Sequence, residues 1–437
     1  MDLFSIASLI VVLAALFGYV NVRFLRLPNA IGLMLISIVA TLLIMASAWF
    51  SPPLLESAQN IVETIDFQHI LLDVLLGFLL FAGALHTNFT QLHTYRWPIL
   101  AFATLGVSIS TLITAGLMYA ALQWLGLPIP FLECLLFGAL ISPTDPIAVM
   151  GILRKANVPK SLEIKIVGES LFNDGVGVVL FLTLLSIVNH ASGGHAAGLE
   201  GAGVEGAEHA AQATGWLSVV QLLGQEVLGG VLLGLGLGLA SYRLMKSIDD
   251  YEIEVIITLA CVMGGYSLAH HLHVSAPLAM VVAGLFIGND RFRGSAMSER
   301  TEEYVDKFWE LVDVLMNVVL FVLIGLEILV ITLEPEYFLA AACAIVIVML
   351  ARFVSLLGPI QIFKRRLEFA PYATTLMTWG GLRGGISIAL ALSLPPSTHR
   401  ELLVTVTYGV VVFSIVVQGL SIGWLAKRLL TGRQSIA

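Results

Sequence analysis

Charged residues are scarce in this chain of 437 residues. Only 12% are Asp, Glu, Lys or Arg, against 58% hydrophobic residues, whereas a soluble domain carries about 25% charged residues. This composition excludes a soluble globular domain and predicts an integral membrane protein that has the lipid bilayer as its surroundings. Nothing in it predicts a bound cofactor, a nucleic-acid partner or an enzyme active site.

Cysteine is equally scarce, and the alternating pattern of membrane β-strands is missing. Cys134, Cys261 and Cys343 each fall in an apolar stretch, so we expect packing residues and no disulfide framework. A helix satisfies its own backbone hydrogen bonds in lipid, and about 20 apolar residues suffice to cross the bilayer. The sequence therefore predicts an all-α membrane protein.

Thirteen apolar stretches are long enough to be membrane-spanning helices. We place the spans at 2–22, 29–49, 67–86, 97–125, 129–153, 163–190, 216–242, 251–271, 276–290, 304–333, 336–362, 371–395 and 401–426. The first span has no basic residue before it, and Arg23 and Arg26 follow it. We therefore expect a retained helix rather than a cleaved signal.

Alternate loops contain no Lys or Arg except Arg400. All Lys and Arg residues except Arg352, Arg383 and Arg400 lie near span ends on one side. Basic residues mark the cytoplasmic side of a membrane protein. We therefore expect one transmembrane domain over residues 1–437, with its N-terminus outside and its C-terminus in the cytoplasm.

The longest loop, 191–215, contains no Lys or Arg and many Gly and Ala residues. We expect it to be flexible and extracytoplasmic. It follows six spans, and after one further span six more remain. Two sets of six spans in opposite orientations predict an inverted repeat.

Ionisable residues lie in the middle of span 163–190, in "GESLFNDGVGVVLF" (168–181). Asp174 would lie about 16 Å deep at about 1.5 Å per residue, near the middle of a core about 30 Å thick. Ser170 and Asp174 share one helix face, and Glu169 and Asn173 form the adjacent row. An ionisable group costs at least about 2.5–3.5 kcal/mol there. The cluster indicates a transport pathway, and a set of polar contacts between helices is the alternative.

Span 129–153 contains "ISPTDPIAV" (141–149). Pro143 and Pro146 each remove an amide donor and clash with the preceding turn, so the helix should unwind around Thr144 and Asp145. Unwound backbone at this depth is tolerated where protein buries it or a wet cavity adjoins it. Its freed carbonyls, with Thr144 and Asp145, would offer oxygen ligands to a cation. A simple proline kink is the alternative.

Two arginines lie inside the later spans. Arg383 falls in "TWGGLRGGISIAL" (378–390), where four glycines interrupt span 371–395. This span is the counterpart of 129–153 in the inverted repeat, and paired interrupted helices are typical of transporter sites. The two breaks would cross, and Arg383 would help to neutralise the helix dipoles. Arg352 lies deep in span 336–362 and needs a buried partner, for which we favour Glu169.

The motifs "SPTDPIAV", "GESLFNDG", the "AR" at Ala351 and Arg352, and "GGLRGGISIALALSLP" together resemble the sodium/proton antiporter family, in its NhaP and NHE branch. The resemblance covers nearly the whole chain. It implies thirteen helices, a homodimer in the plasma (inner) membrane and a six-helix core that moves like an elevator. It implies electroneutral exchange of Na⁺, or of Li⁺ or K⁺, against H⁺.

The resemblance also implies residue roles. Asp174 is the aspartate that carries either the cation or the proton, and Asn173 beside it is a further ion-binding residue. Asp145, Thr144 and Ser170 match cation-coordinating positions, so that Na⁺ would be bound chiefly by Asp174 and Asp145.

A structural ion pair between Glu169 and Arg352 is implied in the same way. One position departs from the family pattern, because Ala82 stands in "LLFAGALH" where many relatives have a glutamate. This departure leaves the cation preference open between Na⁺, Li⁺ and K⁺.

Other function classes are compatible with buried aspartates. A K⁺/H⁺ exchanger of the same fold is the nearest alternative. An intramembrane aspartyl protease would need a Gly-x-Gly-Asp motif, which the sequence lacks. A cation channel would respond to voltage alone, without coupling to protons.

Overall fold

The chain is almost entirely helical in a computed structural model, which describes residues 3–48, 50–65, 67–87, 89–145, 147–156, 158–191, 216–289, 297–331, 334–364 and 372–431. The first half contains α1 (Leu3–Val20), η1 (Asn21–Leu25), α2 (Asn29–Ser47), α3 (Pro52–Glu63), α4 (Phe67–His69), η2 (Ile70–Leu75), α5 (Leu76–Leu85), α6 (Phe89–Thr94), α7 (Arg96–Ala101), η3 (Phe102–Gly106), α8 (Val107–Trp124), α9 (Phe131–Ile141), α10 (Ile147–Lys155) and α11 (Lys160–Ala191). The η elements are π-helical turns that continue the neighbouring α-helices.

The second half begins after the predicted loop 191–215, of which residues 192–215 lie outside the described part of the chain. It contains α13 (Trp216–Met245), α14 (Tyr251–His271), α15 (Ala276–Ile287), α17 (Glu299–Glu327), α18 (Pro335–Phe363), α19 (Ala373–Trp379), α20 (Gly385–Leu392), α21 (Arg400–Phe413), η4 (Ser414–Gln418) and α22 (Gly419–Thr431).

Each predicted span coincides with helical residues. Within the described ranges, nine helices are long and apolar enough to cross a membrane. Three of the other four predicted spans each combine two shorter elements, namely η2 with α5, α9 with α10, and α19 with α20. The fourth is the single short helix α15. The all-α membrane fold is thus confirmed, while the number of crossings and the inverted repeat stay predictions.

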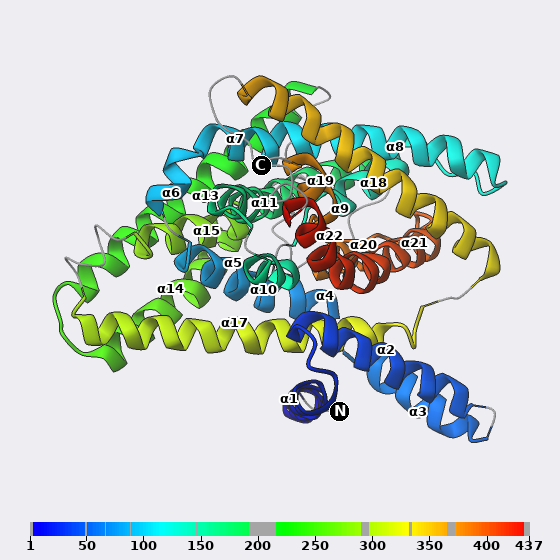
Figure 1. Ribbon diagram of the computed structural model, residues 1–437, viewed down its shortest axis with the longest axis horizontal. Coiled ribbons are helices and arrows are strands. Elements are labelled where there is room, and N and C mark those ends of the chain that lie inside the picture. The colour runs from blue at the N-terminus through cyan, green and yellow to red at the C-terminus, as the bar shows by residue number, and fades with distance from the viewer. Residues whose placement is uncertain are drawn as a thin grey trace.

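Figure 1 shows α17 running along the lower edge of the molecule, with α2 and α3 side by side beneath its end. The Thr41 hydroxyl of α2 donates to the carbonyl oxygen of Gly325 at 2.8 Å. Gln59 of α3 likewise donates to Leu329 at 2.8 Å. Helix α3 was not predicted, because its 12 residues are too few and too polar to read as a span.

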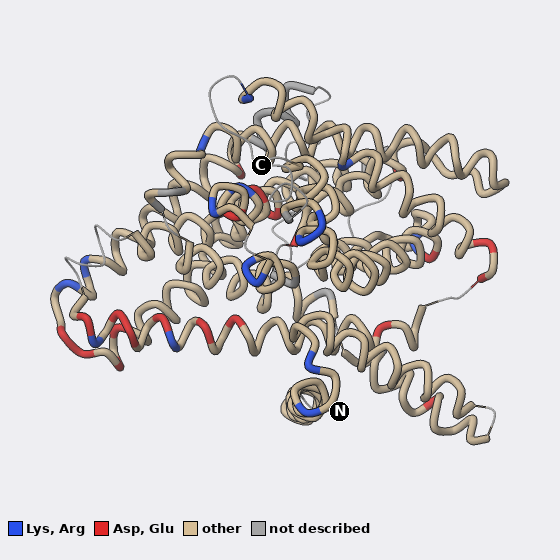
Figure 2. Tube along the Cα trace, in the orientation of Figure 1, with Lys and Arg blue, Asp and Glu red and all other residues tan. Residues whose placement is uncertain are grey.

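Acidic residues gather where α14 and α17 begin, and the rest of the tube in Figure 2 is mostly uncharged. Beside these helix ends an apolar cluster surrounds Trp309, which is fully buried. Its ring lies 4.6 Å from that of Phe81 in α5, and its indole donates to Thr258 in α14 at 2.9 Å. These contacts join α5, α14 and α17 into one unit, because buried aromatic rings supply large contact areas.

A stripe of glycines in α13 lies directly against α15. A Cβ atom at Gly234 would stand 2.5 Å from the carbonyl oxygen of Ala279, and one at Gly238 would stand 2.8 Å from the Cβ atom of Phe286. Small residues allow membrane helices to approach this closely. Gly236, on another face of the same helix, has no atom within 4 Å of such a position.

We therefore expect Gly234→Leu to lower the thermal unfolding temperature of the purified protein, because forcing atoms into a packed contact costs about 1–3 kcal/mol. The matched variant Gly236→Leu should leave the unfolding temperature unchanged. Equal unfolding temperatures for the two variants, measured side by side in detergent, would contradict this packing.

Candidate functional site

Two interrupted helices meet at the centre of the molecule. Helix α9 ends at Ile141 before α10 starts at 147, and α19 ends at Trp379 before α20 starts at Gly385. Pro143 and the glycines of the second break deprive each segment of regular helical hydrogen bonds. Where the two breaks cross, the amide of Asp145 donates to the carbonyl oxygen of Leu382 at 2.8 Å.

Opposite charges face the helix ends at this crossing. The buried guanidinium of Arg383 donates to the carbonyl oxygens of Ser142 and, at 2.8 Å, Pro143, just beyond the carboxyl end of α9. Asp145 packs over Gly384, where a Cβ atom would stand 2.7 Å from Oδ2 of Asp145, next to the amino end of α20. A cation at a carboxyl end and an anion at an amino end both reduce the helix dipole energy.

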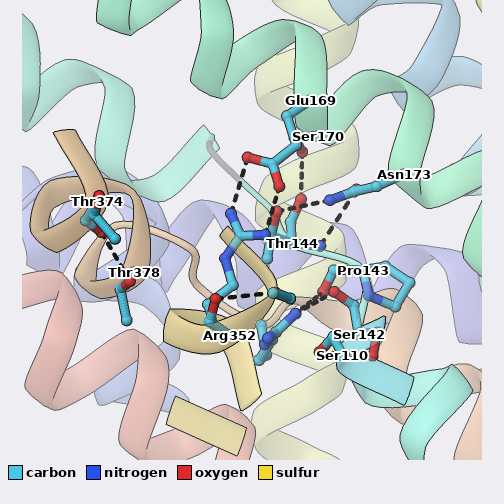
Figure 3. Close-up of polar contacts among 12 residues, drawn as sticks. Ser110, Ser142, Pro143, Thr144, Glu169, Ser170, Asn173, Arg352, Thr374 and Thr378 are labelled. Carbon is cyan, nitrogen blue, oxygen red and sulfur yellow. Dashed lines mark hydrogen bonds and ion pairs between the residues drawn. The ribbon is translucent and has the colours of Figure 1, made fainter. Parts of the chain in front are cut away.

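Two polar side chains of α11 hold the break between α9 and α10 in place. The Ser170 hydroxyl donates to the carbonyl oxygen of Thr144. The Asn173 side chain donates to the Thr144 hydroxyl at 2.9 Å and accepts from its amide at 3.4 Å. Figure 3 shows Ser170 and Asn173 converging on Thr144 from the same helix. Thr144 is therefore held through its side chain and both of its backbone groups.

A cavity of about 240 Å³ adjoins this crossing. Its polar wall includes Asp174, Asp145, Thr144 and Ser170, and its apolar wall comes largely from α5 and α11. The Asp174 side chain is nearly buried, and within the described part of the chain no hydrogen bond or ion pair engages its carboxylate. Carboxylate and hydroxyl oxygens are the ligands that hard cations prefer, so the cavity can hold either a small cation or a proton.

The remaining predicted site residues lie beside the cavity. Asn173 is not among the described residues that line it, and the contacts of its amide are with Thr144. Arg352 and Glu169 form a bidentate pair, with N···O distances of 2.5 and 2.9 Å. Both side chains are buried. Arg383 lies at the helix break, as described above.

Ala82 does not line the cavity. It is fully buried in the apolar cluster around Trp309, whereas its neighbour Gly83 and three leucines of α5 line the cavity. Sequence reasoning missed two polar lining residues, Ser387 of α20 and Asn317 of α17. For Asn317 the available signal was a second polar residue four positions after Asp313 in an otherwise apolar stretch, which places both on one helix face.

Comparisons with known proteins agree with this geometry. The sequence model of the family described as "Sodium/hydrogen exchanger, transmembrane" matches residues 11–428. The Na(+)/H(+) antiporter NhaP of Pseudomonas aeruginosa is 45% identical over an alignment of 438 positions, which covers 98% of this chain and 97% of that protein. The Na(+)/H(+) antiporter NhaH of Halobacillus dabanensis is 31% identical, with 93% of each chain covered.

A solved structure has the same fold. The sodium proton antiporter MjNhaP1 of Methanocaldococcus jannaschii superimposes with a TM-score of 0.73 over 98% of this chain and 100% of that one. The two sequences are 20% identical, so this likeness concerns the fold alone.

The buried pair of Glu169 and Arg352 makes a thermodynamic prediction. Glu169→Gln or Arg352→Gln alone should destabilise the protein by about 3–5 kcal/mol, because each leaves an uncompensated buried charge. The double variant, which removes both charges, should regain part of that loss. The exposed pair of Glu303 and Lys307, 2.6 Å apart, provides the control, and its variants should change stability little. Strictly additive losses in the buried cycle would show that the two charges do not stabilise each other.

Proposed function

The chain belongs to the sodium/hydrogen exchanger family, which confirms the resemblance of its motifs, and we propose that it exchanges Na⁺ for protons across its membrane. Membership of this family makes it a multi-pass membrane transporter rather than an enzyme. The proposal concerns how the residues of this chain carry out the exchange.

One observation carries the proposal. The carboxylate of Asp174 shares a cavity with Asp145 and with hydroxyl oxygens, and no partner in the described part of the chain holds it. The carboxylate of Glu169 is held in an ion pair, and that pair would have to break before the carboxylate could bind a proton or a cation. The carboxylate of Asp174 can bind a proton or a cation without first breaking such a pair.

Exchange then follows from mutually exclusive occupation. A proton and a Na⁺ ion each neutralise the same negative charge, so binding of one removes the attraction for the other. If the loaded site can face either side of the membrane but the empty charged site cannot, the two ions must move in opposite directions. No bond chemistry is required, and the driving force is the difference between the two ion gradients.

The other residues have supporting roles in this proposal. Asp145, Thr144 and Ser170 supply further oxygen ligands. Asn173 positions Thr144 through the hydrogen bonds described above. Arg383 satisfies the broken end of α9, and the pair of Glu169 and Arg352 fixes α11 against α18.

Four finer features belong to the same proposal. We expect electroneutral exchange of one Na⁺ for one proton, with Li⁺ or K⁺ as competing substrates to be compared in the same assay. We expect a homodimer, the plasma (inner) membrane as its location, and the C-terminus on the cytoplasmic side. The last expectation rests on the one-sided distribution of Lys and Arg.

Asp174→Asn should abolish Na⁺-dependent proton movement in proteoliposomes, because an amide of the same shape cannot bind and release a proton. The matched control is Asp249→Asn, at an exposed position before α14, which should transport normally. Both variants should unfold at the wild-type temperature or above it.

Retained pH-dependent Na⁺ flux in a folded Asp174→Asn protein would remove this residue from the mechanism. The same vesicles test stoichiometry when a K⁺ ionophore clamps the membrane potential. An exchange of one ion for one proton should be insensitive to that potential, and a strong voltage effect would contradict it.

A further inference from the structure

A second and larger cavity, of about 790 Å³, adjoins the first. Its wall is built from the residues that join η1 to α2, the start of α2, and parts of α10, α17 and α22. Arg26, Lys155 and Lys427 line it, and Asp313 is the one acidic side chain among the described residues that do so. Since α22 ends the described chain, this cavity lies towards the face that carries the C-terminus.

Asn317 lines both cavities. It stands on α17 one turn after Asp313, and the residue is 7% exposed. The smaller cavity holds Asp174 and Asp145, whereas the larger one holds the three basic side chains. Asn317 therefore marks the wall between the place where an ion would enter and the carboxylates where it would bind.

The orientation of the Asn317 amide is fixed by its neighbour. Its Nδ2 atom donates to the backbone oxygen of Asp313 at 2.9 Å and to the carboxylate Oδ1 of Asp313 at 3.1 Å. Both partners are acceptors, so the nitrogen must occupy this position and the oxygen must point away. That oxygen, Oδ1 of Asn317, is buried and has no hydrogen-bond partner among the described residues.

A buried oxygen without a partner is unfavourable, and such groups are uncommon in folded proteins. An apolar side chain of the same shape would avoid this cost if Asn317 served packing alone. A cation with its hydration shell partly removed would satisfy the oxygen directly. The negative charge of Asp313 would also offset repulsion from the basic side chains along the larger cavity.

We propose that Asn317, oriented by Asp313, forms a transfer site for a partly dehydrated monovalent cation between the two cavities. The proposal rests on the proposed exchange function and adds a step to it. An ion from the larger cavity would bind Oδ1 of Asn317 first and would then pass to the carboxylates of Asp145 and Asp174. An ion leaving towards the C-terminal face would take the reverse path.

The test compares Na⁺ entry from the two faces of the membrane. Protein carrying a C-terminal tag is reconstituted, and accessibility of the tag to an impermeant protease identifies vesicles of each orientation. Asn317→Leu keeps the side-chain size and removes the oxygen. Initial rates of Na⁺-dependent proton movement then give kcat/KM for Na⁺ presented at either face.

For Asn317→Leu we expect kcat/KM to fall about tenfold for Na⁺ at the C-terminal face, as for the loss of one ligand to a charge. At the opposite face it should fall by less than about threefold. Asp313→Asn keeps an acceptor for the amide but loses the charge, so the fall at the C-terminal face should be smaller. Leu311→Ala, on an exposed side of the same helix, should behave as wild type.

A separate binding measurement distinguishes a transfer site from a structural role. Na⁺ should raise the thermal unfolding temperature of both cavity variants as much as that of wild type, because the carboxylates remain intact. Unchanged kcat/KM in folded Asn317→Leu, or an equal fall at both faces, would overturn the transfer site. A wild-type protein without Na⁺-dependent proton movement would contradict the proposed function as well, so the two failures are distinct.

Discussion

Backbone groups freed by two helix breaks need hydrogen-bond partners in surroundings where lipid supplies none. The crossing of α9–α10 with α19–α20 meets this need within the protein. The Asp145 amide binds the Leu382 carbonyl, and the Arg383 guanidinium binds the carbonyls that follow α9. Each break thus supplies hydrogen-bond partners for backbone groups of the other, so the two segments stabilise each other. The rest of the site depends on this mutual arrangement.

The crossing also determines where charged side chains can lie within the protein. With the end of α9 neutralised by Arg383, and Asp145 packed beside the start of α20, the helix dipoles are largely compensated. The adjoining α11 then presents Asp174 to the same cavity without an ionic partner in the described structure. A buried ion pair, Glu169 with Arg352, joins α11 to α18 beside the cavity. One part of the site is therefore held by an ion pair, while the carboxylate of Asp174 has no ionic partner in the described structure.

Much of this arrangement can be read from the sequence for a physical reason. Charged residues and prolines are costly in apolar helices, so Asp145, Asp174, Arg352 and Arg383 were conspicuous, and the breaks could be located within a few residues. Contacts between distant segments are harder to infer. The ion-binding role of Asn173 stays a prediction, and its hydrogen bond to Thr144 could not be inferred from the sequence. Neutral Asn317 and the short helix α3 were missed, because neither interrupts an apolar span strongly. The side on which Ala82 packs depends on the rotation of α5, which an almost wholly apolar segment does not specify.

The central claim is that one carboxylate holds either a cation or a proton. The most direct test is the apparent KM for Na⁺, obtained from initial rates in proteoliposomes across a pH series. Each unit of pH supplies tenfold more protons, so KM should rise about tenfold per unit below the pKa of the site, while the maximal rate changes much less. Above that pKa the KM should be constant. A KM that does not vary with pH would contradict competition at Asp174.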